Sequence, residues 1–130
     1  MLVLTIRTDN PEAEIGLFNE QTNVAYQTWH AHRELSKTIH QKIETVLKKQ
    51  GKTLQDVRGL VCFEGPGSFT GLRIGLTVGN ALAYGLGIPI VAAMGDEWIT
   101  KGIARLHAGD QDTIALPHYG AAPNITQPKK

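Results

Sequence analysis

The sequence has little of several features that mark whole classes of protein. Its single cysteine, Cys62, excludes an internal disulfide bond and any zinc site built from several cysteines. No apolar run approaches the roughly 20 residues that a membrane-spanning helix needs. The formal net charge of its 130 residues is only +1, without the clustered basic excess of a protein that binds nucleic acid alone. We therefore expect one cytoplasmic domain with no membrane contact and no autonomous RNA binding, although membership of a larger RNA-binding complex stays open.

The strand-to-helix junction at residues 65–75 lacks the residues of familiar catalytic motifs. A Walker A loop needs a Gly-Lys-Ser/Thr sequence, and this junction contains no lysine. Thr70 stands where the dinucleotide-binding pattern and the nucleophile elbow would both require glycine. Ser68 is therefore better explained as the N-cap of the following helix. His30 and His32 have no third ligand at metal-site spacing. We predict no catalytic residue, no metal and no cofactor, and as a generic nucleotide-binding motif the loop is weak.

The sequence does contain a regular alternation of predicted strands and helices. Three strands come first, and strands and helices then alternate, which predicts an α/β fold with a mixed sheet and helices on its faces. The order is that of the ribonuclease-H-like lobe of actin-type and Hsp70-type ATPases. We assign residues 1–116 to this lobe and residues 117–130, which hold three prolines, to an extended tail. The predicted strands are residues 2–6, 13–18, 24–29, 59–63, 88–92 and 113–116, and the predicted helices are residues 34–50, 69–84 and 96–107.

Small residues recur at every fourth position of the second predicted helix. Gly71, Gly75, Gly79 and Ala83 form one ridge, although each glycine costs about 1 kcal/mol against alanine inside a helix. Close approach of another backbone would offset that cost. The approaching element could be the first helix, the sheet beneath or another chain, and the spacing does not decide between them.

Residues 65–75, which read GPGSFTGLRIG, closely resemble the signature of the TsaB family, also named YeaZ. The first predicted strand and residues 87–92 agree with that family's spacing, so the resemblance covers about residues 1–107. Its signature loop in this chain consists of Gly65, Pro66, Gly67, Ser68, Phe69 and Thr70.

The resemblance implies a function without catalysis by this chain. TsaB proteins have an actin-like ATPase fold but no catalytic machinery, and they pair with the catalytic paralogue TsaD, which the ATPase TsaE joins. The complex transfers a threonylcarbamoyl group to adenosine 37 of tRNA, and this chain would reach tRNA only through the complex. Pairing through the helices of the first lobe predicts an interface of Leu35, Ile39, Ile43, Gly71, Arg73, Gly75, Gly79 and Ala83.

The sequence departs from the family pattern in two places. Arg7 stands where the first strand normally runs into an aspartate, which argues against ATP hydrolysis. The second lobe of about a hundred residues is missing, and the tail resembles the end of TsaB chains, which predicts a natural short form. Two alternatives stay open. One is a small ATP-binding enzyme that uses the loop from Gly65 to Gly71, and the other is a homodimeric scaffold outside tRNA modification.

Overall fold

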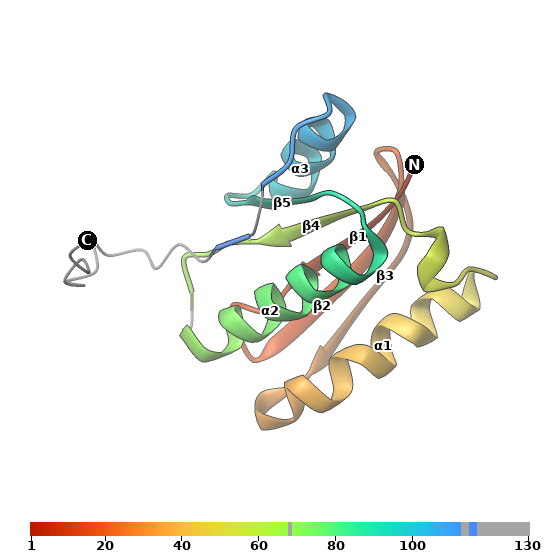
Figure 1. The fold of residues 1–130 in the computed structure, drawn as a ribbon. Coiled ribbons are helices and arrows are strands. Elements are labelled where there is room, and N and C mark those ends of the chain that lie inside the picture. The colour runs from red at the N-terminus through yellow and green to blue at the C-terminus, as the bar shows by residue number, and fades with distance from the viewer. Residues whose placement is uncertain (68, 113–114, 117–130) are drawn as a thin grey trace, which may run out of the picture.

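A computed structural model describes residues 1–67, 69–112 and 115–116 (Figure 1). Within this part of the chain the elements follow the predicted order, and two short 3-10 helices, η1 and η2, flank the first α-helix. The strands are β1 (Leu2–Arg7), β2 (Glu12–Asn19), β3 (Thr22–His30), β4 (Gly59–Phe63) and β5 (Ile90–Ala93), and the helices are η1 (His32–Glu34), α1 (Leu35–Lys49), η2 (Leu54–Asp56), α2 (Phe69–Leu86) and α3 (Trp98–His107).

The five strands form one mixed sheet in the order β3-β2-β1-β4-β5. β1 pairs antiparallel with β2 and parallel with β4, so that Thr5 lies between Gly16 and Val61. β2 and β3 form an antiparallel hairpin, and β4 and β5 are parallel. Parallel neighbours need a long crossover, and α1 and α2 provide the two crossovers of this sheet.

Several predicted boundaries differ from the structure by one or two residues, and the start of β5 is an example with a clear cause. β5 begins at Ile90, two residues later than expected, because Ile88 takes part in the turn that ends α2. Its N–H donates to the carbonyl of Ala83 at 3.0 Å after Gly87 turns the chain with a φ of +68°. The predicted tail, residues 117–130, lies outside the described residues.

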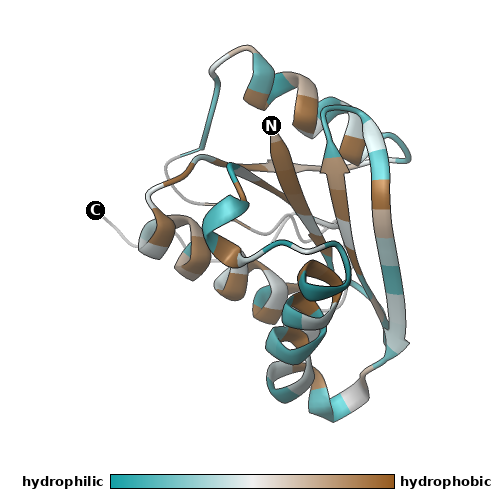
Figure 2. Ribbon diagram, turned by 90° about the vertical axis from the view of Figure 1, so that its right-hand side faces the viewer, coloured by the Kyte–Doolittle hydropathy of each residue, from teal (hydrophilic) through white to brown (hydrophobic). Residues whose placement is uncertain are grey.

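Helices cover both faces of the sheet (Figure 1). α1 and α2 lie on one face, where a Cβ added to Gly79 of α2 would meet the Cys62 and Ile6 side chains. α3 lies on the other face, where one added to Gly102 would meet Val61. Hydrophobic colour is concentrated in the central strands, while the edge strand β3 is mostly polar (Figure 2). Across the described residues, no helix is long and apolar enough to cross a lipid bilayer.

Candidate partner-binding surface and signature loop

The signature loop lies directly on the end of β1. A Cβ added to Gly67 would overlap the Asp9 side chain and lie 3.2 Å from its Cα, so only glycine fits at this contact. Gly65 has a φ of +110°, a conformation that other residues rarely adopt. The two glycines explain why this loop needs its unusual composition. The N-cap predicted for Ser68 lies outside the described residues.

Arg7, at the end of β1, forms a two-point ion pair with Asp9. Its Nε lies 2.7 Å from Oδ1 and its Nη2 lies 3.2 Å from Oδ2. The hydrogen bond with Asp9 raises the pKa of the Arg7 guanidinium, whose central carbon also lies 3.9 Å from the centre of the Phe63 ring. The one carboxylate that directly follows β1 is therefore neutralised by the residue that replaces the expected acid.

The hollow beside the loop offers little to a nucleotide. Asp9 lies among its lining residues, and because its carboxylate is paired with Arg7 it is not free to hold a metal ion for a nucleotide. Arg33 is the one basic residue in the lining. The lining residues are Thr8, Asp9, Asn10, Pro11, Ala31, Arg33, Leu35, Thr70, Gly71 and Ile74. In residues 1–67, 69–112 and 115–116, no three or more His, Cys, Asp or Glu side chains form a group able to hold a metal ion.

The small-residue ridge of α2 faces the chain's own sheet. A Cβ on Gly75 would collide with the Thr8 side chain, and one on Gly79 would collide with the Cys62 sulfur. Thr8 also donates a 2.7 Å hydrogen bond to the carbonyl of Gly71. The sequence left open whether the first helix, the sheet or another chain approaches this ridge, and in the structure it is the sheet.

Most residues of the predicted interface are buried within the chain in the structure. Gly75, Gly79 and Ala83 are buried against the rest of the chain, and so is the apolar stripe of α1. That stripe comprises Leu35, Ile39 and Ile43, with exposed fractions of 4%, 0% and 2%. Gly71 is half-buried, and Arg73 alone of the eight predicted residues is exposed. The sequence could not separate the cases, because packing on a sheet and packing on a partner need the same small or apolar stripe.

The outward side of α2 carries a different stripe, which the sequence reasoning missed. Its exposed residues are separated by three or four positions and therefore share one face. Tyr84 at its end is 92% exposed, which is unusual for an aromatic side chain. We call this set the outer stripe of α2: Thr70, Arg73, Thr77, Ala81 and Tyr84. Apart from Tyr84 it contains no large apolar residue, so no hydrophobic pattern could have indicated it.

A groove runs between the two helices that share this face. Residues of α1, η2 and α2 line it, including Ile43 from α1 and Leu82 from α2. The remaining lining residues are Lys37, His40, Gln41, Glu44 and Leu54. The lining thus combines three apolar residues with four polar or charged ones.

The sheet order and the helices on both faces define a ribonuclease-H-like fold. The RuvC structure from Thermus thermophilus matches 92% of this chain and 86% of its own with a TM-score of 0.54, and at 12% identity this likeness shows the fold alone. YeaZ from Pseudomonas aeruginosa is 25% identical, with a TM-score of 0.63 over 72% of this chain and 45% of its own.

Comparison with known sequences identifies the family to which the chain belongs within this fold class. Residues 27–98 match the family model described as TsaD, tRNA N6-adenosine threonylcarbamoyltransferase, and the chain belongs to this family. Within it, relatives named tRNA threonylcarbamoyladenosine biosynthesis protein TsaB are similar to the chain. The Bacillus subtilis protein is 35% identical over 71% of this chain and 40% of its own length. The Escherichia coli protein is 33% identical over 89% and 50% respectively. The chain thus spans about half the length of these relatives.

Proposed function

We propose that this chain is a TsaB-type, non-catalytic subunit in the formation of threonylcarbamoyladenosine in tRNA, acting by binding a TsaD-type catalytic relative. The observation that carries the proposal is a difference between the residues that follow β1 and the surface of α1 and α2. Just after β1 the Asp9 carboxylate is paired with Arg7 and covered by Gly67, whereas α1 and α2 present a groove with no such pair among its described lining residues. The relatives named TsaB support the biosynthetic role.

The pairing of Asp9 with Arg7 after β1 argues against catalysis by this chain. A nucleotide held through a metal ion needs free carboxylates, and the carboxylate of Asp9 is taken by Arg7. A phosphate entering between the loop and β1 would have to displace Gly67 from Asp9. The ATP-binding alternative is therefore disfavoured. We assign ATP hydrolysis to a TsaE-type partner and place the complex in the cytoplasm with its tRNA.

The helical layer is the surface we assign to the partner. Because Gly75 and Gly79 hold α2 close to the sheet, its opposite side stands free for contact. A pair of helices from a paralogous lobe would fill the groove beside Leu82 and pack along Thr77 and Ala81. The resulting interface would be a four-helix arrangement.

Copurification tests this proposal. The full chain is expected to coelute with the TsaD-type protein of the same organism and to support tRNA modification together with it. Thr77→Arg, on the outer stripe, should abolish coelution without unfolding the chain. Thr100→Arg, an equally exposed change on α3, should have no effect. The assignment would be refuted if the wild-type chain eluted alone, or as a homodimer that does not bind the TsaD-type protein.

A further inference from the structure

Three lysines gather where α1 ends. Lys48 and Lys49 close the helix, and Lys52 follows after a tight turn. In that turn the N–H of Lys52 donates to the carbonyl of Leu47 at 2.9 Å, and the N–H of Gly51 donates to that of Lys48 at 3.0 Å. These bonds form a Schellman motif, with Gly51 in the left-handed conformation at a φ of +68°. The backbone satisfies these carbonyls, so the lysine side chains are not needed to cap the helix.

The three ammonium groups have no carboxylate in close contact, although the charge of Lys52 helps to lower the pKa of Asp56, after the hydrogen bonds that Thr53 makes to that carboxyl. All three residues are exposed, and none forms an ion pair within the part of the chain that the structure describes. Residues 33–58 contain seven basic and three acidic residues, a net charge of +4 in a chain of +1, so the remainder carries −3. The excess of positive over negative charge in this segment favours an anionic ligand.

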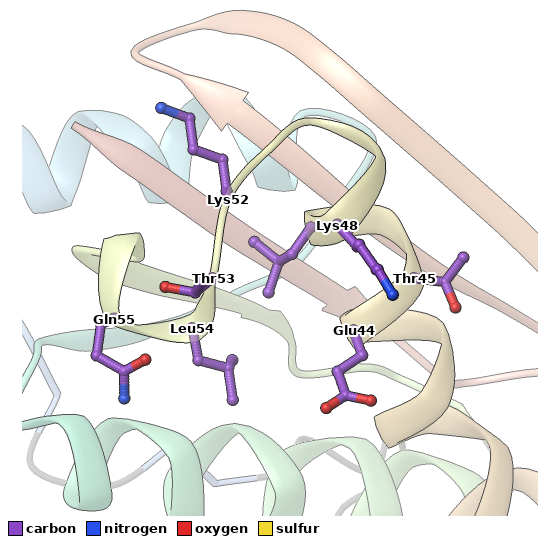
Figure 3. Close-up of a pocket in the computed structure, with 8 residues that line it drawn as sticks. Glu44, Thr45, Lys48, Lys52, Thr53, Leu54 and Gln55 are labelled. Carbon is purple, nitrogen blue, oxygen red and sulfur yellow. The ribbon is translucent and has the colours of Figure 1, made fainter.

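A hollow opens beside two of these lysines (Figure 3). Lys48 lines it from α1 and Lys52 from the following turn, with their side chains extending in different directions, while Thr53 and Gln55 add polar side chains from η2 and its approach. The other lining residues are Glu44, Thr45, Leu47 and Leu54. No aromatic side chain lines the hollow, so it has no platform on which a base could stack.

We propose that the lysine cluster Lys48, Lys49 and Lys52 binds the phosphate backbone of RNA and is this chain's own contact with tRNA in the complex. Ammonium groups attract phosphates as point charges and read no sequence, which suits a subunit that supports a transferase. The choice of RNA rests on the proposed function. Three lysines account for a modest, strongly salt-dependent affinity, so the low net charge of the whole chain is compatible with this contact.

Salt dependence tests the contact directly. The full chain is titrated into fluorescently labelled, unmodified tRNA at salt concentrations from 50 to 200 mM. Neutralising the cluster with Lys48→Gln, Lys49→Gln and Lys52→Gln should reduce the slope of log K against log salt by about 2 to 3, since each phosphate contact contributes about 0.7 to 0.9. The control combines Lys101→Gln, Lys129→Gln and Lys130→Gln, which removes the same charge from positions outside residues 33–58 and outside the outer stripe of α2 and should leave the slope unchanged.

Removing a negative charge from the same hollow gives a second test with the opposite expected effect on tRNA binding. Glu44 lines the same hollow and opposes an anion, so Glu44→Gln should tighten tRNA binding by about 2- to 5-fold at low salt. No detectable tRNA binding at 50 mM salt would overturn the proposal. An equal loss of slope in the control would overturn it as well. Competition by polyglutamate as strong as by tRNA would instead assign the cluster to an acidic protein.

The two proposals fail in different ways. If the cluster variant binds tRNA like the wild type while the chain still coelutes with the TsaD-type protein, only the RNA contact is wrong. If the slope falls as expected but the chain does not coelute, the RNA contact stands and the proposed function is wrong.

Discussion

Asn80 of α2 forms with Ala115 the pair of hydrogen bonds that a neighbouring strand would form. Its Nδ2 donates to the Ala115 carbonyl at 2.9 Å, and its Oδ1 accepts the Ala115 N–H at 2.8 Å. Upstream, the N–H of Asp112 donates to the Ile90 carbonyl at 2.8 Å, in an isolated bridge beside β5. A strand was predicted over residues 113–116, of which 113 and 114 lie outside the described residues. The structure thus fastens the segment after α3 to α2 through one side chain.

Asn80→Ala should destabilise the fold by about 1 to 3 kcal/mol, because it leaves two backbone groups of the buried Ala115 without partners. Asn80→Asp retains one acceptor and should cost less at low pH, where a protonated carboxyl can donate the second bond. Urea denaturation at pH 4 and pH 7 measures both variants. Equal stability of wild type and Asn80→Ala would show that Ala115 is not held by this side chain.

Gly75→Ala should destabilise the chain by about 1 to 3 kcal/mol, since its Cβ would collide with Thr8 beneath α2. Gly85→Ala is the matched control in the same helix. A Cβ there meets nothing within 4 Å, so the helix should gain about 0.5 kcal/mol. Thermal unfolding followed by circular dichroism compares the two. Similar effects at both positions would place the ridge away from the sheet.

Cys62 should be inert to thiol reagents in the folded protein. Burial raises the pKa of its thiol to about 12, above the value near 9 of an exposed cysteine. Because the unfolded state releases this proton first, the contribution to stability is present at neutral pH and is lost as the pH rises above 9. Between pH 8 and pH 10 the wild type should lose about 1 kcal/mol more than Cys62→Ala. Parallel losses in the two proteins would contradict the assignment.

Arg7→Asp should not restore nucleotide binding, although it returns the residue that the TsaB pattern has at this position. The change breaks the pair with Asp9 and the stacking on Phe63, and it places a second carboxylate beside Asp9. We expect a loss of about 1 to 3 kcal/mol in stability and no binding of labelled ATP. Arg7→Lys, which keeps the charge but not the two-point geometry, should cost less. Tight ATP binding by either variant would reopen the enzymatic alternative.

The sequence predicted the element order well because most elements carry a clear period. The apolar stripe from Leu35 to Leu47 and the buried run of β4 identify a helix and a strand without tertiary information. It did not predict which side of α2 meets which neighbour. That side depends on Thr8 and Cys62, which are 67 and 17 residues away from Gly75 and Gly79 along the chain. Such contacts leave no local period.

The sequence analysis did not predict either of the two proposed binding surfaces, for different reasons. The outer stripe of α2 has the ordinary composition of a solvated helix face, with Tyr84 as its one unusual member. The lysine cluster was visible, but the low net charge of the chain concealed that one segment is basic and the remainder acidic. The Schellman turn that brings Lys52 back beside the helix end is a property of the folded backbone.

Because the inner ridge of α2 consists mainly of glycines, this helix packs closely against the end of β1. Gly75 lies directly against the Thr8 side chain, which also donates a hydrogen bond to the Gly71 carbonyl, so this contact has little free space. Thr8 adjoins Asp9, on which Gly67 of the signature loop is seated. The signature loop, α2 and the end of β1 therefore meet at two neighbouring residues, Thr8 and Asp9.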